Sequence, residues 1–401
     1  DHTAEYLAHG SDFILTGEGE ATLGELLDRL TGKNDRPLDS IAGLAYAGQD
    51  GALIRTPRRP DLRDLDSLPF PAWDLVDIPN YRQTWQKRHG YFSMNMVTTR
   101  GCPFHCNWCA KPIWGQRYNS RSPENVVAEL AWLKETYQPD HIWFADDILG
   151  LKPGWIEQFA DLVEQKSARV PFKSLNRADL LLHGETISAL ARAGAEIVWI
   201  GAESGSQKVL DAMEKGTRVE QIGEAARRLH EAGIRVGFFL QFGYPGEEME
   251  DIQKTLQMVR DDCPDDIGIS VSYPLPGTKF YAKVQAQVGA KQNWTDSQDM
   301  AMLYQGPYPT AFYHKLHRLV HTEFRLRKQF TSLTELVQRP RAIRPRHIRQ
   351  AGKTVMRWLA LPALRWDLAR AARRNSSVQA LSPWLTPEAA ARPTPQSKGE
   401  L

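Results

Sequence analysis

The 401-residue sequence lacks several features that would assign it to a special class of protein. No apolar run reaches the roughly 18–20 residues that a membrane-spanning helix requires, and no signal peptide stands at its start. The formal net charge of +2 argues neither for nor against nucleic-acid binding, and no nucleic-acid partner is expected. The four cysteines are too few and too clustered for a disulfide framework. This pattern predicts a reducing compartment, and the cytoplasm is the expected location.

Three of the four cysteines share one short loop. Cys102, Cys106 and Cys109 are separated by three and then two residues, so one loop can direct all three thiolates at a single metal centre. Four cysteines would ligate every iron of a four-iron cluster. Three leave one iron without a protein ligand, and an open coordination position lets a metal site carry out chemistry.

A structural zinc site is the alternative interpretation of this loop, with His105 or Cys263 as the fourth ligand. Structural zinc sites usually combine two short ligand clusters, and the sequence contains no second cluster. On this alternative the protein would be a zinc-stabilised binding or scaffold protein rather than an enzyme. Cys263 lies between a predicted helix and the last predicted strand, where a lone thiol is the simpler interpretation.

From about residue 94 to residue 273 the sequence alternates short apolar runs with longer segments of helical periodicity. Such alternation predicts βα units around a parallel sheet. The predicted strands are 94–99, 141–145, 172–177, 196–201, 234–240 and 267–272. Six units are fewer than the eight of a closed TIM barrel, so the expected fold is an α/β, six-stranded partial (β/α) barrel.

Polar or glycine-rich clusters follow most of the predicted strands, at the end where barrels of this type carry their chemistry. Besides Trp108 in the cysteine loop, the candidate binding residues are Asp146, Asp147, Arg177, Glu203, Ser204, Gly237, Gln241 and Phe242. An acid can hold an ammonium group, an arginine can hold a carboxylate, and a glycine lets a flat ligand approach the backbone. The simpler alternatives are helix capping for Asp147, a surface ion pair for Arg177 and plain burial for Trp108.

The Cys-x3-Cys-x-aromatic-Cys loop, with Trp108 as the aromatic residue, resembles the cluster loop of radical S-adenosylmethionine (SAM) enzymes. The resemblance extends from about residue 10 to about residue 330. It includes the segment 17–20 (Gly-Glu-Gly-Glu) and the linker 66–74, which are similar to the cobalamin-binding subfamily. That subfamily includes methyltransferases and the anaerobic tetrapyrrole cyclase.

The resemblance implies a [4Fe-4S] cluster on Cys102, Cys106 and Cys109, whose open iron chelates SAM. An electron from the cluster then splits SAM, and the resulting 5′-deoxyadenosyl radical takes a hydrogen atom from the substrate. The acids at the second and fourth strand ends, with Ser204, would meet the methionine amino group or the ribose. Arg177 would meet the carboxylate, and the fifth strand, with Gly237, Gln241 and Phe238 or Phe242, would surround the adenine.

The resemblance leaves two reactions open. The first is cobalamin-dependent methyl transfer to an unactivated carbon, and the second is an oxidation or ring closure without methyl transfer. The expected partners are a small-molecule substrate, apolar or tetrapyrrole-like, and a reductase, ferredoxin or flavodoxin as the electron donor.

The resemblance also divides the chain into parts. They are 1–60 (C-terminal remnant of a cobalamin-binding domain), 61–92 (linker), 93–290 (radical SAM core), 291–380 (helical basic region) and 381–401 (disordered tail). The Asp-x-His-x-x-Gly loop whose histidine ligates cobalt in that family is absent. The sequence is therefore interpreted as N-terminally truncated, and cobalamin is expected to bind only to a full-length form.

Residues 341–374 contain ten Lys or Arg and a single acid, Asp367, among many apolar residues. A basic amphipathic segment of this kind can lie on a membrane surface. The alternative is a helix that docks on the core and turns a solvated basic face outward. A peripheral membrane contact is thus one of two interpretations of this segment.

Overall fold

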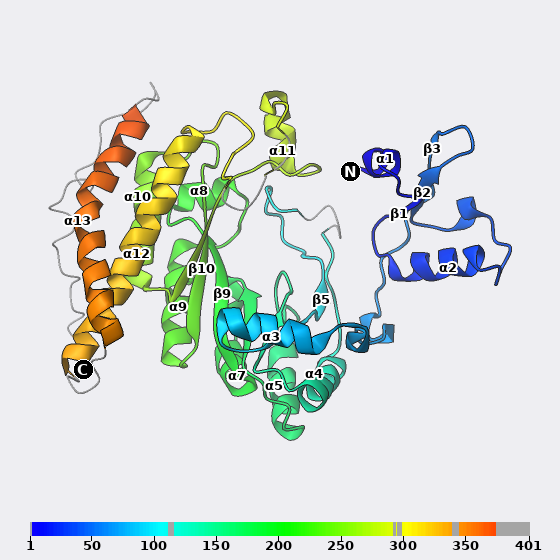
Figure 1. Ribbon diagram of the computed structural model, residues 1–401, viewed down its shortest axis with the longest axis horizontal. Coiled ribbons are helices and arrows are strands. Elements are labelled where there is room, and N and C mark those ends of the chain that lie inside the picture. The colour runs from blue at the N-terminus through cyan, green and yellow to red at the C-terminus, as the bar shows by residue number, and fades with distance from the viewer. Residues whose placement is uncertain (1, 111–115, 292–293, 295–298, 339–344, 374–401) are drawn as a thin grey trace.

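The computed structural model describes all residues except 1, 111–115, 292–293, 295–298, 339–344 and 374–401. Three parts follow one another along the chain (Figure 1): a small N-terminal module, a parallel sheet with its helices, and a pair of long C-terminal helices. The N-terminal module and the C-terminal helices lie at opposite sides of the sheet (Figure 1).

The N-terminal module has a three-stranded antiparallel sheet in the order β1-β2-β3. Its elements are α1 (Thr3–Ala8), β1 (Phe13–Leu15), α2 (Glu20–Leu30), η1 (Leu38–Ser40), β2 (Leu44–Ala47) and β3 (Leu53–Arg55). Leu26, Ile41 and Leu44 form a small core of their own, separate from the main core.

The linker that follows contains η2 (Leu65–Ser67), η3 (Trp73–Leu75) and α3 (Ile78–His89). The limits of α3 follow from its sequence. The Asp77 side chain accepts a hydrogen bond from the backbone N–H of Asn80, and a proline occupies the first turn. Gly90 ends the helix with a φ of 84°, a left-handed conformation that glycine adopts without strain.

The central sheet has six parallel strands in the order β11-β10-β9-β8-β7-β4. They are β4 (Ser93–Met96), β7 (His141–Phe144), β8 (Phe172–Asn176), β9 (Ala195–Glu203), β10 (Arg235–Phe242) and β11 (Asp266–Val271). Because each strand lies beside the next one in the chain, every crossover advances in the same direction, as in a barrel. The predicted six-stranded partial barrel is confirmed.

The helices of the βα units cover one face of this sheet and form the main core with it. They are α4 (Pro123–Tyr137), α5 (Trp155–Gln165), α6 (Ala178–Leu181), α7 (Thr186–Ala193), α8 (Gln207–Ala212), α9 (Val219–Glu231) and α10 (Met249–Asp262). Alternate residues of each strand point to this face, for example Val198 and Ile200, which are fully buried. The other face, which we call the inner face, carries Trp199 and Phe239, stacked 4.6 Å apart.

The remaining elements are α11 (Lys279–Val284), η5 (Gln285–Gln287), α12 (Thr310–Gln338) and α13 (Pro345–Arg373). α12 contributes Phe312, Leu316 and Leu319 to the main core, and α13 packs along α12. Within the described residues, no helix is both long enough and apolar enough to cross a membrane.

Candidate functional site

The cysteine loop leaves the carboxyl end of β4 and is closed at its base by a short antiparallel ladder. β5 (Thr99–Arg100) precedes the loop, β6 (Asn119–Ser120) follows it, and the two strands pair. Cys102, Cys106 and Cys109 are all half-buried. The loop thus presents its three thiols at the edge of the sheet where the chemistry of a barrel is expected.

Asp146 fixes the start of this loop. It follows β7 and is 2% exposed. Its carboxylate accepts hydrogen bonds from the backbone N–H groups of Thr98 and Thr99, at 2.7 and 2.8 Å, and from both threonine hydroxyls, at 2.9 and 3.0 Å. Burial raises the pKa of Asp146 to about 6, although the four hydrogen bonds favour the charged form. Asp146 is engaged within the chain, which leaves Asp147 as the exposed acid of the pair.

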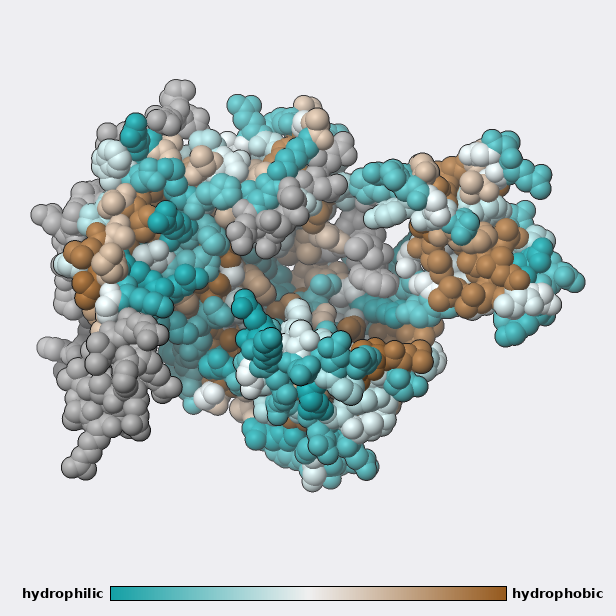
Figure 2. Space-filling model, in the orientation of Figure 1, coloured by the Kyte–Doolittle hydropathy of each residue, from teal (hydrophilic) through white to brown (hydrophobic). Residues whose placement is uncertain are grey.

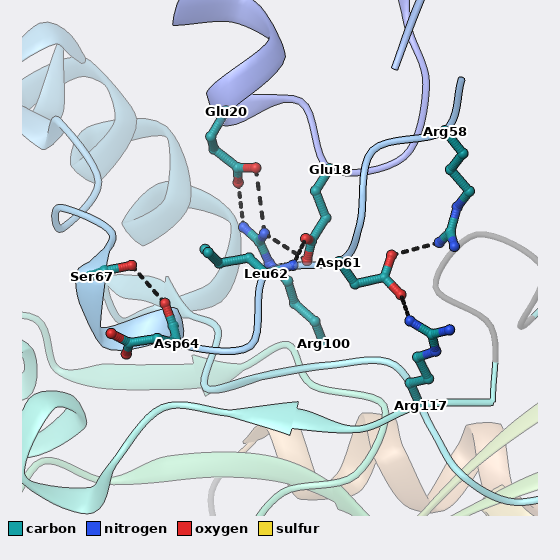
Figure 3. A network of polar contacts seen from close by, with 9 residues as sticks. All are labelled: Glu18, Glu20, Arg58, Asp61, Leu62, Asp64, Ser67, Arg100 and Arg117. Atoms are coloured by element: carbon teal, nitrogen blue, oxygen red, sulfur yellow. Dashed lines mark hydrogen bonds and ion pairs between the residues drawn. The ribbon is translucent and has the colours of Figure 1, made fainter. Parts of the chain in front are cut away.

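An ion-pair network joins the same flank of the loop to the N-terminal module (Figure 3). Arg100, two residues before Cys102, pairs with Glu18 at 3.1 Å and also with Glu20. Glu18 is buried, and its second oxygen accepts a hydrogen bond from the backbone N–H of Leu62. The Gly-Glu-Gly-Glu segment, which sequence analysis used only as a family marker, therefore holds the cysteine loop.

The far flank of the loop is tied to the linker in a similar way. The buried carboxylate of Asp61 pairs with Arg117 at 2.9 Å and with Arg58 at 2.6 Å. Arg117 comes shortly before β6, so Figure 3 shows both flanks of the loop reaching neighbouring acids of residues 18–61. The sequence contained no signal for the pairing of Asp61 with Arg117, because these two residues lie 56 positions apart in the chain.

The second half of the loop is anchored by Asn107, which sequence analysis missed. Asn107 is 3% exposed and uses nearly all of its polar groups. Its backbone N–H and side-chain NH₂ donate to the carbonyls of Met213 and Ala212, at 3.0 and 2.8 Å. Its side-chain oxygen accepts from the Tyr244 hydroxyl at 2.8 Å, and its carbonyl accepts from the N–H of Phe280 at 3.0 Å.

Trp108 is packed, as its simpler interpretation expected. The indole contacts a small apolar cluster that includes Val209, Met213, Tyr244 and Phe280. Its Nε1 is buried and has no hydrogen-bond partner among the described residues. In this structure Trp108 therefore helps Asn107 to hold the loop against α8 and α11.

Arg177 also contacts the loop. Its guanidinium lies 3.6 Å from the centroid of the Phe104 ring, between the first two cysteines in sequence. It pairs with Asp179 at 3.0 Å and donates to the Thr217 hydroxyl at 3.1 Å. The alternative of a surface ion pair is wrong, because the Arg177 side chain is buried. A cation over an aromatic face is stabilising, so Arg177 supports the loop from β8.

Glu203 and Ser204 end β9, and both are buried. Glu203 accepts a hydrogen bond from the Lys215 ammonium at 2.8 Å and has a φ of 57°, a left-handed conformation that non-glycine residues adopt at a cost. The Ser204 hydroxyl lies 3.1 Å from the Thr255 hydroxyl. Both residues thus lie at the expected edge of the sheet, and both side chains have partners within the chain.

On β10 the predicted residues lie on different faces of the sheet. A side chain at Gly237 would collide with the indole of Trp199, so the glycine makes room for that ring on the inner face. Gln241 is buried, and its Oε1 has no hydrogen-bond partner among the described residues. Phe242, like Phe238, lies in the main core. The predicted adenine contact of these phenylalanines does not agree with their placement, because the helices cover them.

The zinc alternative loses one of its two candidate fourth ligands. Cys263 ends α10 and precedes β11, so it lies at the amino edge of the sheet, opposite the cysteine loop. In the described part of the chain, no three His, Cys, Asp or Glu side chains converge on a position for one metal ion. A four-iron cluster takes one cysteine per iron, so its ligands lie further apart than those of a single ion.

Comparisons with known proteins agree with this geometry. The family model described as the radical SAM superfamily matches residues 96–259. An uncharacterized methyltransferase of Pyrococcus horikoshii is 28% identical over 272 residues, which cover 67% of this chain and 57% of the relative. The anaerobic magnesium-protoporphyrin IX monomethyl ester cyclase of Rubrivivax gelatinosus is 28% identical over 284 residues, covering 69% and 50%. The chain spans about half the length of the curated relatives it matches.

Two solved structures share the fold. The cobalamin-dependent SAM radical enzyme OxsB with aqua-cobalamin bound has a TM-score of 0.66 at 18% identity, covering 90% of this chain and 57% of that one. The radical SAM methyltransferase TsrM from Kitasatospora setae has a TM-score of 0.58 at 20% identity, covering 73% and 58%. With the cysteine loop at the carboxyl edge of a six-stranded partial barrel, residues 96–259 of this chain are a radical SAM domain, and the cofactors of that superfamily are a [4Fe-4S] cluster and SAM.

Proposed function

We propose that this chain is the radical SAM part of a cobalamin-dependent enzyme that transfers a methyl group to an unactivated carbon of a small, apolar or tetrapyrrole-like molecule. The cysteine loop carries the proposal, because three thiols leave one iron of a cluster open. Relatives named as methyltransferases support methyl transfer. Cobalamin binding is proposed only for a full-length form with an Asp-x-His-x-x-Gly loop.

The residues present fit these cofactors. Three half-buried cysteines from one anchored loop are the donor set of a cluster with an open iron. Gln241 offers a buried oxygen that has no partner among the described residues, which suits an N–H donor such as the adenine amino group of SAM. When bound, the cluster and SAM together supply the one-electron chemistry that removes a hydrogen atom from the substrate.

The chain's own residues would position these groups. Cys102, Cys106 and Cys109 hold the cluster, and Asp146 and Asn107 keep the loop in place. Asp147 is an exposed acid at the carboxyl edge, where it can accept a charge-assisted hydrogen bond from the methionine ammonium group. A ferredoxin, flavodoxin or reductase is the proposed electron donor. Thiolate ligands also favour a reducing compartment, so the cytoplasm is the proposed location.

The first test is cluster assembly. Anaerobic reconstitution is expected to give a brown protein with about four irons per chain and a paramagnetic signal after reduction with dithionite. Cys106→Ala is expected to lose the signal and reductive cleavage of SAM. Cys263→Ala is the matched control, because this cysteine lies at the opposite edge of the sheet and should change neither. Zinc in place of iron, or a cluster that survives Cys106→Ala, would refute the proposal.

Oxidation or ring closure without methyl transfer is the second candidate, favoured by relatives named as anaerobic cyclases. The products of turnover separate the two reactions. Methyl transfer produces S-adenosylhomocysteine in addition to 5′-deoxyadenosine, whereas the second reaction produces no S-adenosylhomocysteine. A full-length form that turns over its substrate without forming S-adenosylhomocysteine would exclude methylation and leave the cluster assignment intact.

A further inference from the structure

Helix α13 is apolar on two opposite faces. Its inner face contributes Leu361, Leu368 and Ala372 to the main core. An ion pair of 2.8 Å between Arg365 and Glu323 of α12 adds to this docking. The sequence-based alternative of a docked helix is therefore confirmed as far as the inner face is concerned. A helix docked in this way normally turns polar side chains outward.

The outer face of α13 does not follow that pattern. Its large apolar side chains are 55–68% exposed, and they are Val355, Met356, Trp358, Leu359 and Trp366. Single exposed apolar residues are common, whereas five on one helix form a patch that marks an interaction site. Figure 2 shows hydrophobic residues at the edge of the molecule where Figure 1 places α13. The outer face of the described part of α13 is therefore not simply the solvated basic face of the docked-helix alternative, because these apolar side chains occupy part of it.

The charged residues around this patch are mainly basic. Lys353 and Arg370 are exposed, and the Arg370 guanidinium lies 5.5 Å from the Trp366 ring. The single acid of the segment, Asp367, forms an ion pair with Lys315 of α12. The outer surface of α13 therefore combines an apolar strip that contains two tryptophans with a positive flank.

We propose that the outer face of α13 binds the surface of a membrane that contains anionic lipids. Tryptophan is favoured at the boundary between lipid headgroups and acyl chains, and basic side chains are attracted to anionic headgroups. α13 is not apolar enough to span a bilayer, which fits a helix that lies in the interface plane. A symmetric contact between two copies would instead bring the two positive flanks together, so like charges oppose self-association through this face.

Vesicle co-sedimentation with the full chain tests this proposal. The protein is expected to sediment with vesicles made of equal parts phosphatidylcholine and phosphatidylglycerol, and much less with phosphatidylcholine alone. The double variant Leu359→Glu with Trp366→Glu should weaken binding by about tenfold or more, because it places charges in the lipid interface. Lys353→Glu should weaken binding to the anionic vesicles by about fivefold or more.

Leu75→Glu is the matched control, because Leu75 is an exposed apolar residue outside α13 and its change should leave vesicle binding intact. Circular dichroism and thermal unfolding verify that each variant is folded. Absence of vesicle binding, or binding that the double variant leaves unchanged, would overturn the proposal. So would light scattering that shows a dimer which the double variant converts to a monomer, since the patch would then be covered by a second copy.

Discussion

The first flank of the cysteine loop is held by charged groups, whereas Asn107 and Trp108 hold its second half mainly through neutral contacts. Asp146 and Glu18 act on residues 98–100, before the first cysteine. Asn107 and the packing of Trp108 act on the second half. The charged contacts come from β7 and the N-terminal module, and the neutral contacts come from α8, the loop after β10 and α11. The two halves should therefore respond differently to salt, to pH and to changes in the N-terminal module.

The largest expected effect is the loss of the Asp146 anchor. Asp146→Ala leaves two buried backbone N–H groups without acceptors, so the free energy of unfolding should fall by about 3–5 kcal/mol. Urea unfolding measures this change, and iron content after reconstitution reports on the loop. Ser188→Ala, at an exposed position on α7, is the control. If Asp146→Ala proved as stable as that control, the charged anchor would be of little importance.

The neutral anchor is expected to contribute somewhat less. Asn107→Ala removes three buried or half-buried side-chain hydrogen bonds, with the Ala212 carbonyl, the Glu214 carboxylate and the Tyr244 hydroxyl, which should cost about 2–3 kcal/mol. This loss should depend little on salt, because no charged group is removed and the contact with the Glu214 carboxylate is long, at 3.4 Å. Urea unfolding at two salt concentrations tests both points. A loss that shrinks strongly in high salt would contradict the distinction between the two anchors.

Removal of the contact with the N-terminal module should have a smaller effect that depends on salt. Glu18→Gln keeps the shape of the side chain and weakens its pairing with Arg100, which should cost about 1–2 kcal/mol in low salt. The variant should also increase protease cleavage within the cysteine loop. Glu25→Gln is the control, because Glu25 pairs with Arg59 inside the module and does not touch the loop. Equal cleavage in the two variants would exclude a role for Glu18 in holding the loop.

The smallest expected effect is a pH dependence of stability that comes from the Asp146 anchor and not from the Asn107 anchor. Burial raises the pKa of Asp146 from 3.8 to about 6, so the folded state binds this proton more tightly than the unfolded state does. The free energy of unfolding should therefore fall as the pH rises from about 4 to about 6, by at most about 1.4 kcal/mol per pH unit, and this contribution is constant above that range.

Asp146→Asn should remove this slope, whereas Asn107→Ala should keep it. Urea unfolding of the three proteins across this pH range gives the comparison. A slope that persists in Asp146→Asn would assign the titration to another buried acid.

Sequence analysis succeeded where the relevant pattern is local. The six apolar runs became the six strands because side-chain alternation and strand length are properties of a few adjacent residues. It was less successful in assigning roles at the strand ends. Asp146 and Asp147 are adjacent and chemically identical, yet one is buried among threonines and the other is exposed. Which of the two acids turns inward depends on the hydrogen-bond donors that follow the neighbouring strand β4. The sequence around Asp146 and Asp147 contains no information about those donors.

The same limit explains the residues that were missed. Asn107 lies between two cysteines, but its partners are more than a hundred residues away in the chain. Glu18 and Arg100 are 82 residues apart. Arg177 was expected to bind a carboxylate, and the structure adds a stacked contact with Phe104. At such separations many polar residues in the sequence could form the hydrogen bond or ion pair, and only the folded structure determines which of them does.

The spacing of Cys102, Cys106 and Cys109 and the order of the apolar runs were sufficient to predict a cluster loop at the edge of a partial barrel. Both depend on short stretches of chain whose geometry is nearly independent of the rest. The tertiary structure decided which groups hold the loop and which face of α13 remains uncovered. These outcomes depend on contacts between distant segments, and such contacts are determined by how all the elements pack together.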